Sequence, residues 1–335
     1  MKAIVCKQFG PYQELQIAEL PNPTVGPRQV LIDVAAAGVN FLDTLIVQGR
    51  YQVRPAVPFA PGGEVSGVVR SVGAGVEGLR SGQRVAAMAS YGGYATQLVA
   101  NVDSVFPIPD SMTFVEAAGF LVAYGTSYHA LIRRAHLIKG ERLLVLGAAG
   151  GVGLTAVEIG KRLGAEVIAA ASSDEKLARC AQYGADQLIN YSSGELRSQL
   201  KDLTAGEGVN VVYDPVGGPF AEQAIRSLAF LGRYLVVGFA AGEIPKIATN
   251  LLLLKSAAAV GIAWGAFAEK YPRESAADVR TLMGWYADGY LRPFVSAVYP
   301  LDQCVNALET LVHRQAQGKV VLQINPMSAD AGYKL

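Results

Sequence analysis

The fold of this chain is decided by the stretch Arg142-Leu143-Leu144-Val145-Leu146-Gly147-Ala148-Ala149-Gly150-Gly151-Val152-Gly153. A run of branched apolar residues leads directly into a cluster of glycines, and an apolar periodic segment follows as far as Leu163. This order predicts a buried strand, a tight glycine turn and a helix. The start of such a helix offers unpaired N–H groups and the positive end of its dipole to a pyrophosphate.

The glycines are spaced as Gly147-x-x-Gly150-x-x-Gly153. This spacing is a relative of the GxGxxG dinucleotide fingerprint, whose first glycine would fall at Ala148. Alone it is weak evidence, because glycine turns between strand and helix also occur where no ligand binds. The segments that follow it in the chain decide between these two interpretations.

Strands and helices alternate from residue 142 onward. Helices are expected to end at Gly164, Gly184 and Gly232. The expected strands are 142–147, 166–171, 186–190, 209–213, 233–238 and 257–263. The expected helices are 152–163, 174–183, 194–204, 219–230 and 246–255. Six strands with crossover helices predict a doubly wound parallel sheet of the Rossmann type, with a dinucleotide site at its switch point.

The chain before this region has a different pattern. Short strands separated by glycine and proline are expected at 3–5, 15–17, 30–34, 65–69, 84–87 and 94–99. They predict a compact antiparallel β barrel or sandwich. Helical periodicity then covers 113–122 and 125–135. After Trp264 we expect helices at 275–288 and 301–312 and strands at 294–298 and 320–324, which return to the first domain. The fold class is α/β, with domains 1–122 plus 265–335 and 123–264.

Composition limits the class of protein. The chain has 335 residues, of which 51% are hydrophobic and 17% charged, and its net charge is +1. This indicates a globular protein and favours neither nucleic acid nor a membrane as partner. The three cysteines are far apart, as expected for a reducing compartment such as the cytoplasm. Lys255 interrupts the most apolar stretch, 250–267, so we expect a buried helix and a strand there, not a membrane span. The last three residues resemble a peroxisomal signal only in part, and a frayed tail is expected.

The second expected strand indicates which dinucleotide binds. An NAD site usually has an acidic side chain at this strand end, about 20 residues beyond the glycine turn. Here the strand ends Ala169-Ala170-Ala171-Ser172-Ser173, and Lys176 lies one helical turn further on. Hydroxyl and ammonium donors without a carboxylate favour a 2′-phosphate and predict NADPH. Alternatively, a serine only caps the next helix and Lys176 lies in solvent.

The motifs together resemble the quinone oxidoreductase branch of the medium-chain dehydrogenase/reductase superfamily, over nearly the whole chain. The resemblance rests on the glycine stretch, the strand alternation and five further segments. These are Gly38-Val39-Asn40-Phe41-Leu42-Asp43, Gly49-Arg50-Tyr51, Pro61-Gly62-Gly63-Glu64-Val65-Ser66-Gly67, Ala123-Tyr124-Gly125-Thr126 and Asp214-Pro215-Val216-Gly217-Gly218. It implies a GroES-like β-rich catalytic domain, a Rossmann domain, NADPH as electron donor and an active-site cleft between the domains.

Zinc-dependent members of the superfamily have a cysteine ligand where this sequence has Asn40, and a histidine where it has Gly63. They also carry a four-cysteine lobe, which is missing here. His129, His136 and His313 are too dispersed to replace these ligands and are expected at the surface or in helix packing. We therefore expect no metal. Without zinc to stabilise an alkoxide, reduction of a quinone or an enone is the chemistry that the sequence favours.

The resemblance also implies roles for individual residues. Asn40 and Tyr51 are the catalytic candidates and would line the substrate and nicotinamide pocket. Packing is the alternative role for Tyr51, and also for Tyr191 and Trp264, which are assigned to the cofactor below. The candidates for NADPH binding are Thr126 at the nicotinamide, Gly150, Gly151 and Val152 at the pyrophosphate, Ser172, Lys176, Tyr191 and Arg314 at the 2′-phosphate, and Gly238, Phe239 and Trp264 around the nicotinamide. Leu45 replaces a tyrosine that the branch often has in this pocket, which makes the pocket more apolar.

These residues predict direct hydride transfer from NADPH to a quinone or enone, with the proton supplied by water or Tyr51. The alternatives are an enoyl-thioester or alkenal reductase of the same fold, and an NADPH-loaded binding or structural protein with little turnover. The apolar sixth strand would form a sheet edge, and such an edge predicts a two-fold homodimer.

Overall fold

The computed structural model describes residues 1–325. The chain forms two compact units, one of residues 1–122 together with the chain from Lys270 onward, and one of Ala123–Glu269. Helix α9 (Trp264–Lys270), which the sequence analysis did not predict, lies at the second boundary. The expected frayed tail, residues 333–335, lies outside the described residues.

The first unit is built mainly on antiparallel strands, as expected, and only β14 and β15 pair in parallel among the described strands of its sheets. Its main sheet has the order β14-β15-β3-β4-β5-β7, β6 pairs with β3, and β1 and β2 form a separate pair. The strands are β1 (Lys2–Val5), β2 (Gln16–Glu19), β3 (Gln29–Val39), β4 (Glu64–Val72), β5 (Arg84–Met88), β6 (Gln97–Asn101), β7 (Val105–Pro107), β14 (Val295–Pro300) and β15 (Lys319–Gln323). The C-terminal segment contributes to this sheet, because β15 pairs with β3.

Helices close the first unit. They are α1 (Phe41–Val47), α2 (Phe114–Ala118), α10 (Pro272–Ala287) and α11 (Cys304–Val312), with 3-10 turns at Tyr12–Glu14, Val102–Ser104 and Leu301–Gln303. The apolar faces of the sheet strands, α1 and α11 meet in one core that includes Ile32, Ile46, Val65 and Leu308. Strand β3 is the longest and its residues 34–39 are fully covered, so its end is a rigid base for Asn40.

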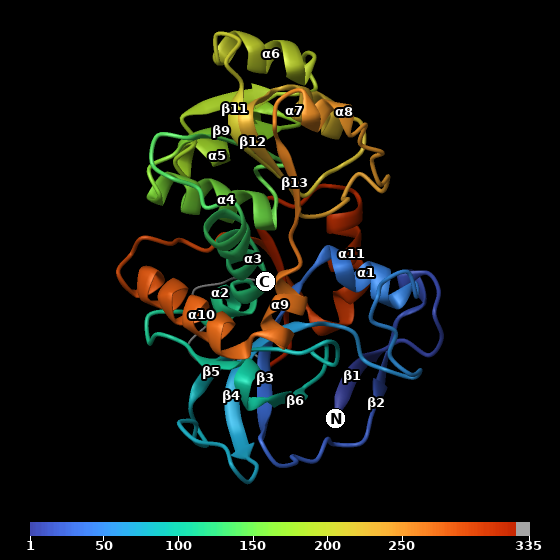
Figure 1. The fold of residues 1–335 in the computed structure, drawn as a ribbon. Coiled ribbons are helices and arrows are strands. Elements are labelled where there is room, and N and C mark those ends of the chain that lie inside the picture. Colours follow the sequence, from blue (N-terminus) through green and yellow to red (C-terminus); the bar gives the residue numbers. More distant parts are fainter. Residues whose placement is uncertain (326–335) are drawn as a thin grey trace. The chain divides into compact units, whose positions relative to one another are not determined.

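The second unit is a six-stranded sheet of order β10-β9-β8-β11-β12-β13 (Figure 1). All neighbouring strands are parallel. The strands are β8 (Arg142–Leu146), β9 (Glu166–Ala171), β10 (Gln187–Asn190), β11 (Val209–Asp214), β12 (Leu228–Val236) and β13 (Ala258–Gly261). This is the doubly wound order, and it places the switch point between β8 and β11, as predicted.

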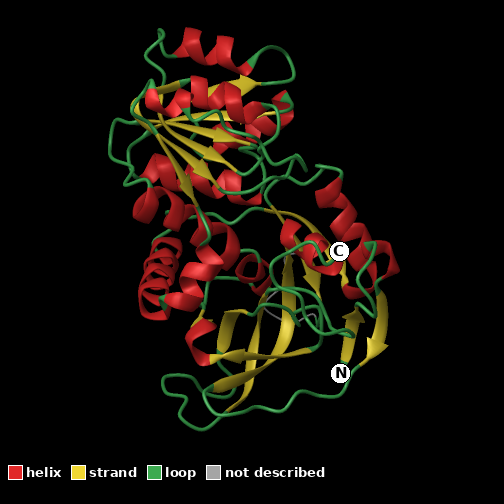
Figure 2. Ribbon diagram, turned by 45° about the vertical axis from the view of Figure 1, so that its right-hand side comes forward, coloured by secondary structure: helices red, strands yellow, loops and turns green. Residues whose placement is uncertain are grey.

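Helices cover both faces of this sheet (Figure 2). They are α3 (Leu121–Tyr128), which continues as a π-helical turn at His129–Arg134, α4 (Gly151–Arg162), α5 (Asp174–Gln182), α6 (Leu196–Leu203), α7 (Phe220–Arg226) and α8 (Asn250–Leu253). One face forms a core with α6, α7 and α8 that includes Leu144, Ile168, Leu200 and Ile225. The buried strand predicted at the start of the glycine stretch is confirmed, because residues 143–146 of β8 are fully buried.

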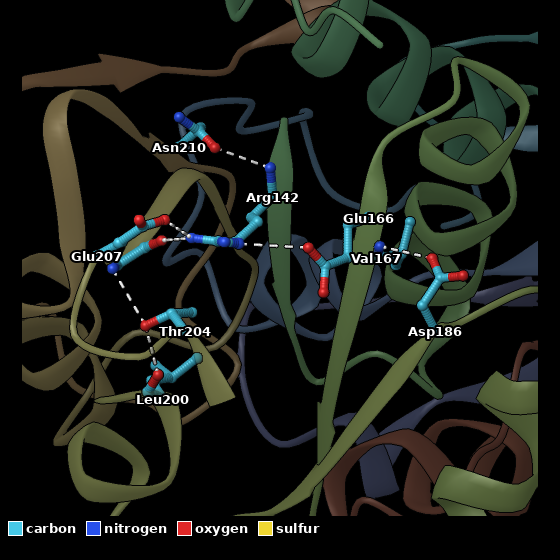
Figure 3. A network of polar contacts seen from close by, with 9 residues as sticks. Arg142, Glu166, Val167, Asp186, Leu200, Thr204, Glu207 and Asn210 are labelled. Atoms are coloured by element: carbon cyan, nitrogen blue, oxygen red, sulfur yellow. Dashed lines mark hydrogen bonds and ion pairs between the residues drawn. The ribbon is translucent and has the colours of Figure 1, made fainter. Parts of the chain in front are cut away.

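Polar contacts hold the amino ends of the strands together (Figure 3). Arg142 donates from Nε to Glu166 at 3.3 Å and from Nη1 to Glu207 at 2.9 Å. The Asn210 side chain accepts the Arg142 N–H at 2.8 Å, and Asp186 accepts the Val167 N–H at 2.9 Å. Because the charged groups are partly exposed, each ion pair contributes about 0.2–1 kcal/mol. These contacts align the strands at the edge opposite their carboxyl ends.

Three sequence predictions were wrong, two in this unit and one in the first unit. The helix expected at 246–255 is a single turn, and the apolar stretch expected to be buried leaves Leu253 79% and Leu254 74% exposed. Gly232 does not end a helix: α7 ends at Arg226, and Gly232 lies inside β12, which begins earlier than expected. The expected strand 94–99 is displaced to β6, since the Tyr94 N–H bonds outside it, to Pro61.

Candidate active site

The glycine turn follows β8 at the carboxyl edge of the parallel sheet. Gly147 has φ +56°, a left-handed conformation that suits glycine. Gly153 faces the turn so closely that a Cβ there would lie 2.3 Å from the Gly147 carbonyl oxygen. Gly150 is the N-cap of α4, and no side chain caps this helix. The first N–H groups of α4, from Gly151 and Val152, are therefore available to an anion.

The loop after β11 lies beside this turn. A Cβ on Gly147 would meet Cγ2 of Val216 at 2.8 Å. The buried carboxylate of Asp214 shapes the loop by accepting the N–H groups of Val216 at 2.7 Å and Gly217 at 2.8 Å, and also the Tyr234 hydroxyl. Burial nevertheless raises the pKa of Asp214 above its ordinary value.

Gly238 and Phe239 follow β12 and reach the same loop. A Cβ on Gly238 would lie 3.3 Å from the Pro215 carbonyl oxygen, and one on Gly217 would lie 3.0 Å from the Phe239 ring. The sequence-predicted residues Gly150, Gly238 and Phe239 thus lie around the carboxyl ends of β8, β11 and β12. Ligands of doubly wound sheets bind at this edge.

Helix α3 is locked to the start of α4, and this positions Thr126. Ser127 donates to the Val152 carbonyl at 3.0 Å, and Thr155 donates to the Ala123 carbonyl at 3.1 Å. The Trp264 ring packs on Gly125, where a Cβ would lie 2.2 Å from Cζ2 of the indole. The Trp264 indole N–H is buried and has no acceptor within residues 1–325.

The tip of β9 presents donors, as the sequence predicts. The Lys176 ammonium lies 3.3 Å from the Ser172 hydroxyl, while Ser173 caps α5. The carboxylate of Asp174 accepts from Asn190 at 2.8 Å. Ser173 therefore caps the next helix, whereas Ser172 lies beside the ammonium.

Two further residues were assigned to the 2′-phosphate. Tyr191 follows β10, and its ring packs on Phe220 with centroids 4.4 Å apart. Its N–H is held by the carbonyl of Ala171, the last residue of β9, at 3.1 Å. Arg314 lies in the first unit, exposed, just after α11.

In the first unit, Asn40 joins the end of β3 to α1. Its side-chain oxygen accepts from the Lys319 ammonium at 2.6 Å, and its amide nitrogen donates to Glu64 at 3.2 Å. The carboxylate of Asp43 accepts the Asn40 main-chain N–H at 2.8 Å and the Tyr94 hydroxyl at 2.7 Å. Tyr51 is half-buried against the core of this unit, and burial, followed by the charge of Asp43, raises its pKa.

Sequence reasoning missed the partners of Asn40, which are Glu64 and Lys319. Both are buried, with exposed fractions of 0% for Glu64 and 7% for Lys319. Each is a charged residue that begins a strand and is followed by buried residues, in β4 for Glu64 and in β15 for Lys319. A charge in such a run is an unusual pattern that could have marked a buried polar network.

Two family models match the chain: the alcohol dehydrogenase GroES-like domain over residues 26–110 and the zinc-binding dehydrogenase over residues 151–280. The rat quinone oxidoreductase-like protein 2 is 37% identical over 324 residues, which cover 96% of this chain and 92% of the rat protein. The human quinone oxidoreductase is 30% identical over 326 residues, which cover 96% of this chain and 97% of the human protein. The chain belongs to the quinone oxidoreductase branch of the medium-chain dehydrogenase/reductase superfamily. The protein is thus an oxidoreductase of this family.

Among solved structures, the quinone oxidoreductase of Escherichia coli complexed with NADPH has a similar fold, with a TM-score of 0.91 and 29% identity. The match covers 97% of this chain and all of the other. The GroES-like and Rossmann parts predicted from the sequence are therefore both confirmed.

One of the matching family models is named for zinc binding, but the part of the chain that the structure describes lacks the arrangement of ligands that zinc requires. Within residues 1–325, no group of three or more His, Cys, Asp or Glu side chains is arranged to hold a metal ion. The polar groups at position 40 and at Glu64 are both bonded to the Lys319 ammonium. A cation already bonded to these groups disfavours a second, metallic one, so the residues at this position do not fit zinc.

Within the described residues, no helix is both long enough and apolar enough to cross a membrane. The three cysteines are buried free thiols. Of the three histidines, His129 is buried and packs on Phe267 with ring centroids 4.5 Å apart, while His136 and His313 are exposed.

Asp43 makes the stability of the first unit depend on pH. Burial is the main cause that raises its pKa, to about 6, and its Oδ1 has no hydrogen-bond partner within residues 1–325. Because the folded-state pKa exceeds the unfolded value of 3.8, Asp43 stabilises the fold most at low pH. That stability is lost as pH rises from about 4 through 6, by an amount on the order of 3 kcal/mol.

Asp43→Asn removes this titration. Between pH 4 and 7, the melting temperature of the wild type is expected to fall relative to that of D43N, measured by calorimetry. The exposed residue Asp302 provides a control, since D302N should follow the wild type at every pH. Parallel curves for wild type and D43N would contradict the assignment.

Proposed function

We propose that this protein is an NADPH-dependent, zinc-independent reductase of quinones or similar conjugated carbonyl compounds. The observation that carries the proposal is the combination of an uncapped helix start at Gly150 with the Lys176–Ser172 pair at the tip of β9. The first suits a pyrophosphate, and the second suits the 2′-phosphate that distinguishes NADPH from NADH. The NADPH bound to the E. coli structure supports the same cofactor.

NADPH, when bound, supplies a hydride. Gly150, Gly151 and Val152 would hold its pyrophosphate, and Ser172, Lys176, Tyr191 and Arg314 would bind its 2′-phosphate. Thr126, Gly238, Phe239 and Trp264 would hold the nicotinamide end. Asn40 and Tyr51 would bind the acceptor carbonyl, on which negative charge develops during reduction. Tyr51 or water would supply the proton.

Zinc-independence is supported by the Lys319 ammonium, which donates to Asn40 at the position of the missing zinc ligand. Without a Lewis acid, alkoxide formation is poorly stabilised, whereas a conjugated acceptor spreads its charge. A quinone or an enone therefore fits the site better than an alcohol does. A cytoplasmic location is part of the same proposal, because buried free thiols suit a reducing compartment.

The direct test measures NADPH oxidation with 1,4-benzoquinone, 9,10-phenanthrenequinone and an enone. Turnover with at least one quinone, unchanged by a chelator, is the expected result. Turnover with enoyl thioesters or alkenals alone would favour the related double-bond reductases. Tight NADPH binding with no turnover on any acceptor would favour a binding role.

We also propose a homodimer formed through the β13 edges of two chains. Strand β13 is the last in the sheet, and its residues 258, 259 and 261 are exposed. Apolar side chains lie near it in the chain, with Leu253 and Leu254 more than 70% exposed. An apolar sheet edge of this kind invites pairing with a second copy.

The double variant Leu253→Lys/Leu254→Lys is expected to sediment as a monomer under conditions in which the wild type is a dimer, because it places charge in the apolar contact. Leu188→Lys is the matched control, since Leu188 is an exposed apolar residue on β10, at the opposite edge of the sheet. A wild type that stays monomeric at micromolar concentration would refute the dimer.

A further inference from the structure

Lys319 is a buried cation at the centre of the first unit. It begins β15, which lies between β14 and β3. Its ammonium donates to Asn40 Oδ1 at 2.6 Å, to Glu64 Oε2 at 3.3 Å and to the Val39 carbonyl at 3.4 Å. Three acceptors therefore use the three donors of an ammonium, and the buried charge is fully hydrogen-bonded.

The surrounding backbone leaves room for this network. A Cβ on Gly119 would lie 3.1 Å from Cβ of Lys319, so the lysine stem runs directly along Gly119. A Cβ on Gly38 would lie 2.1 Å from the Ala118 carbonyl oxygen and 2.7 Å from Glu64 Oε2. Glycine at positions 38 and 119 thus allows Lys319 and Glu64 to reach Asn40.

The network fixes which way the Asn40 amide points. Its oxygen faces the ammonium and its nitrogen faces the Glu64 carboxylate. The reverse orientation would place N–H groups against the ammonium and the amide oxygen against the carboxylate, which is unfavourable at both contacts. Asn40 itself is partly exposed, unlike Lys319 and Glu64. One N–H of its amide remains to donate beyond the network.

We propose that Lys319 is a positioning residue for the reduction: it holds the Asn40 amide so that this remaining N–H donates to the carbonyl oxygen of the acceptor. The inference rests on the proposed function. The hydride, with its electron pair, adds to the conjugated acceptor, and a π electron pair moves onto the carbonyl oxygen. NADPH leaves as NADP⁺, and the oxygen then takes a proton from Tyr51 or water.

The ammonium also strengthens the donor. An amide whose oxygen accepts from a cation is polarised, so its N–H groups become better donors. The hydrogen bond to the acceptor therefore strengthens as negative charge develops on the oxygen. An interaction that is stronger in the transition state than in the ground state raises kcat. Lys319 and Glu64 would therefore favour acceptors that have a carbonyl oxygen.

The test must separate positioning from folding. Removing Lys319 alone would leave the buried Glu64 carboxylate unpaired, which costs several kcal/mol. The double variant Lys319→Met/Glu64→Gln removes both charges and keeps an acceptor for the Val122 N–H, which Glu64 binds at 2.9 Å. Its melting temperature is compared with that of the wild type before any kinetics.

With a quinone acceptor, the double variant is expected to lower kcat by about 10- to 100-fold, below the full loss of an oxyanion donor, and to leave the KM for NADPH unchanged. In an Asn40→Ala background the same double change should have no further effect on kcat, because Lys319 acts through Asn40. An equal loss in both backgrounds, or an unchanged kcat, would overturn the proposal.

A second readout does not depend on turnover. The side-chain ¹⁵NH₂ resonances of Asn40 are expected to shift in the double variant, while those of Asn101, whose side-chain oxygen accepts from Asp103, stay in place. Unchanged Asn40 resonances would refute the positioning. If the wild type fails to oxidise NADPH with every acceptor tested, both the proposed function and the role of Lys319 in reduction are overturned. If the Asn40 resonances shift in that case, the result shows only that Lys319 and Glu64 contact the Asn40 amide.

Discussion

Gly153→Ala is expected to weaken NADPH binding by about 100-fold, which corresponds to about 2.8 kcal/mol, and to lower the melting temperature of the second unit. The added methyl group would lie 2.3 Å from the Gly147 carbonyl oxygen and 2.9 Å from Cα of Ala148. Both are backbone atoms, so the turn itself must open. The Gly147 carbonyl also accepts the Gly150 N–H at 3.0 Å, and this contact fixes the start of α4.

Overpacking of this kind costs about 1–3 kcal/mol in stability. Calorimetry gives the melting temperature, and titration calorimetry gives the Kd for NADPH. Gly284→Ala is the matched control: it lies in α10, is exposed, and has no atom within 4 Å of a built Cβ. That change should stabilise the helix by about 1 kcal/mol and leave NADPH binding unchanged. An unaltered Kd for G153A would contradict the role of the turn.

Some parts of the fold are determined by short, continuous stretches of sequence. The turn from β8 to α4 is specified within twelve consecutive residues, so its strand, turn and helix could all be predicted from 142–153. The same holds for β9 and for α5 after Ser173, whose hydroxyl caps the helix at Lys176. Each combines a regular apolar pattern with a residue that ends or begins the element.

Elements at the edge of the sheet were harder to predict. Apolar residues such as Leu253 and Leu254 suggest burial, yet both are exposed beside a one-turn helix at the edge of the unit. An apolar pattern predicts that side chains are buried, but it does not tell whether the same chain or a second chain would bury them. Gly232 was misread for a related reason, because a glycine inside a strand looks like the end of a helix.

The network around Asn40 depends on contacts across long stretches of sequence. Lys319 and Glu64 are 255 positions apart, and they meet because β15 pairs with β3, which in turn pairs with β4. The family resemblance pointed to Asn40 but not to the cation behind it. Sequence patterns thus identified the candidate for substrate binding, and the strand order supplied its partners.

Lys176→Ala is expected to reduce kcat/KM for NADPH by about 10- to 50-fold and to change kcat/KM for NADH less than twofold. The ammonium lies 3.3 Å from the Ser172 hydroxyl, so both groups are placed to bind the same phosphate, as proposed above. A hydrogen bond to a charged group contributes about 1.5–3 kcal/mol, and the lower half of this range corresponds to the expected factor. NADH has no 2′-phosphate, so the Lys176 ammonium does not strengthen its binding and the removal of this ammonium does not weaken it.

Arg179→Ala provides the matched control for Lys176. Arg179 belongs to the same helix, and its guanidinium donates to Gln182 at 2.8 Å. Its loss removes one positive charge from α5 but leaves the Lys176–Ser172 contact in place. If the net charge of the helix matters, NADPH binding weakens in both variants. If Lys176 contacts the phosphate directly, NADPH binding weakens only in K176A. Raising the ionic strength should narrow the difference between wild type and K176A, because salt screens a partly exposed charge. If wild type uses NADH as well as NADPH, the donors at the tip of β9 do not bind a phosphate, and the preference for NADPH has to be abandoned.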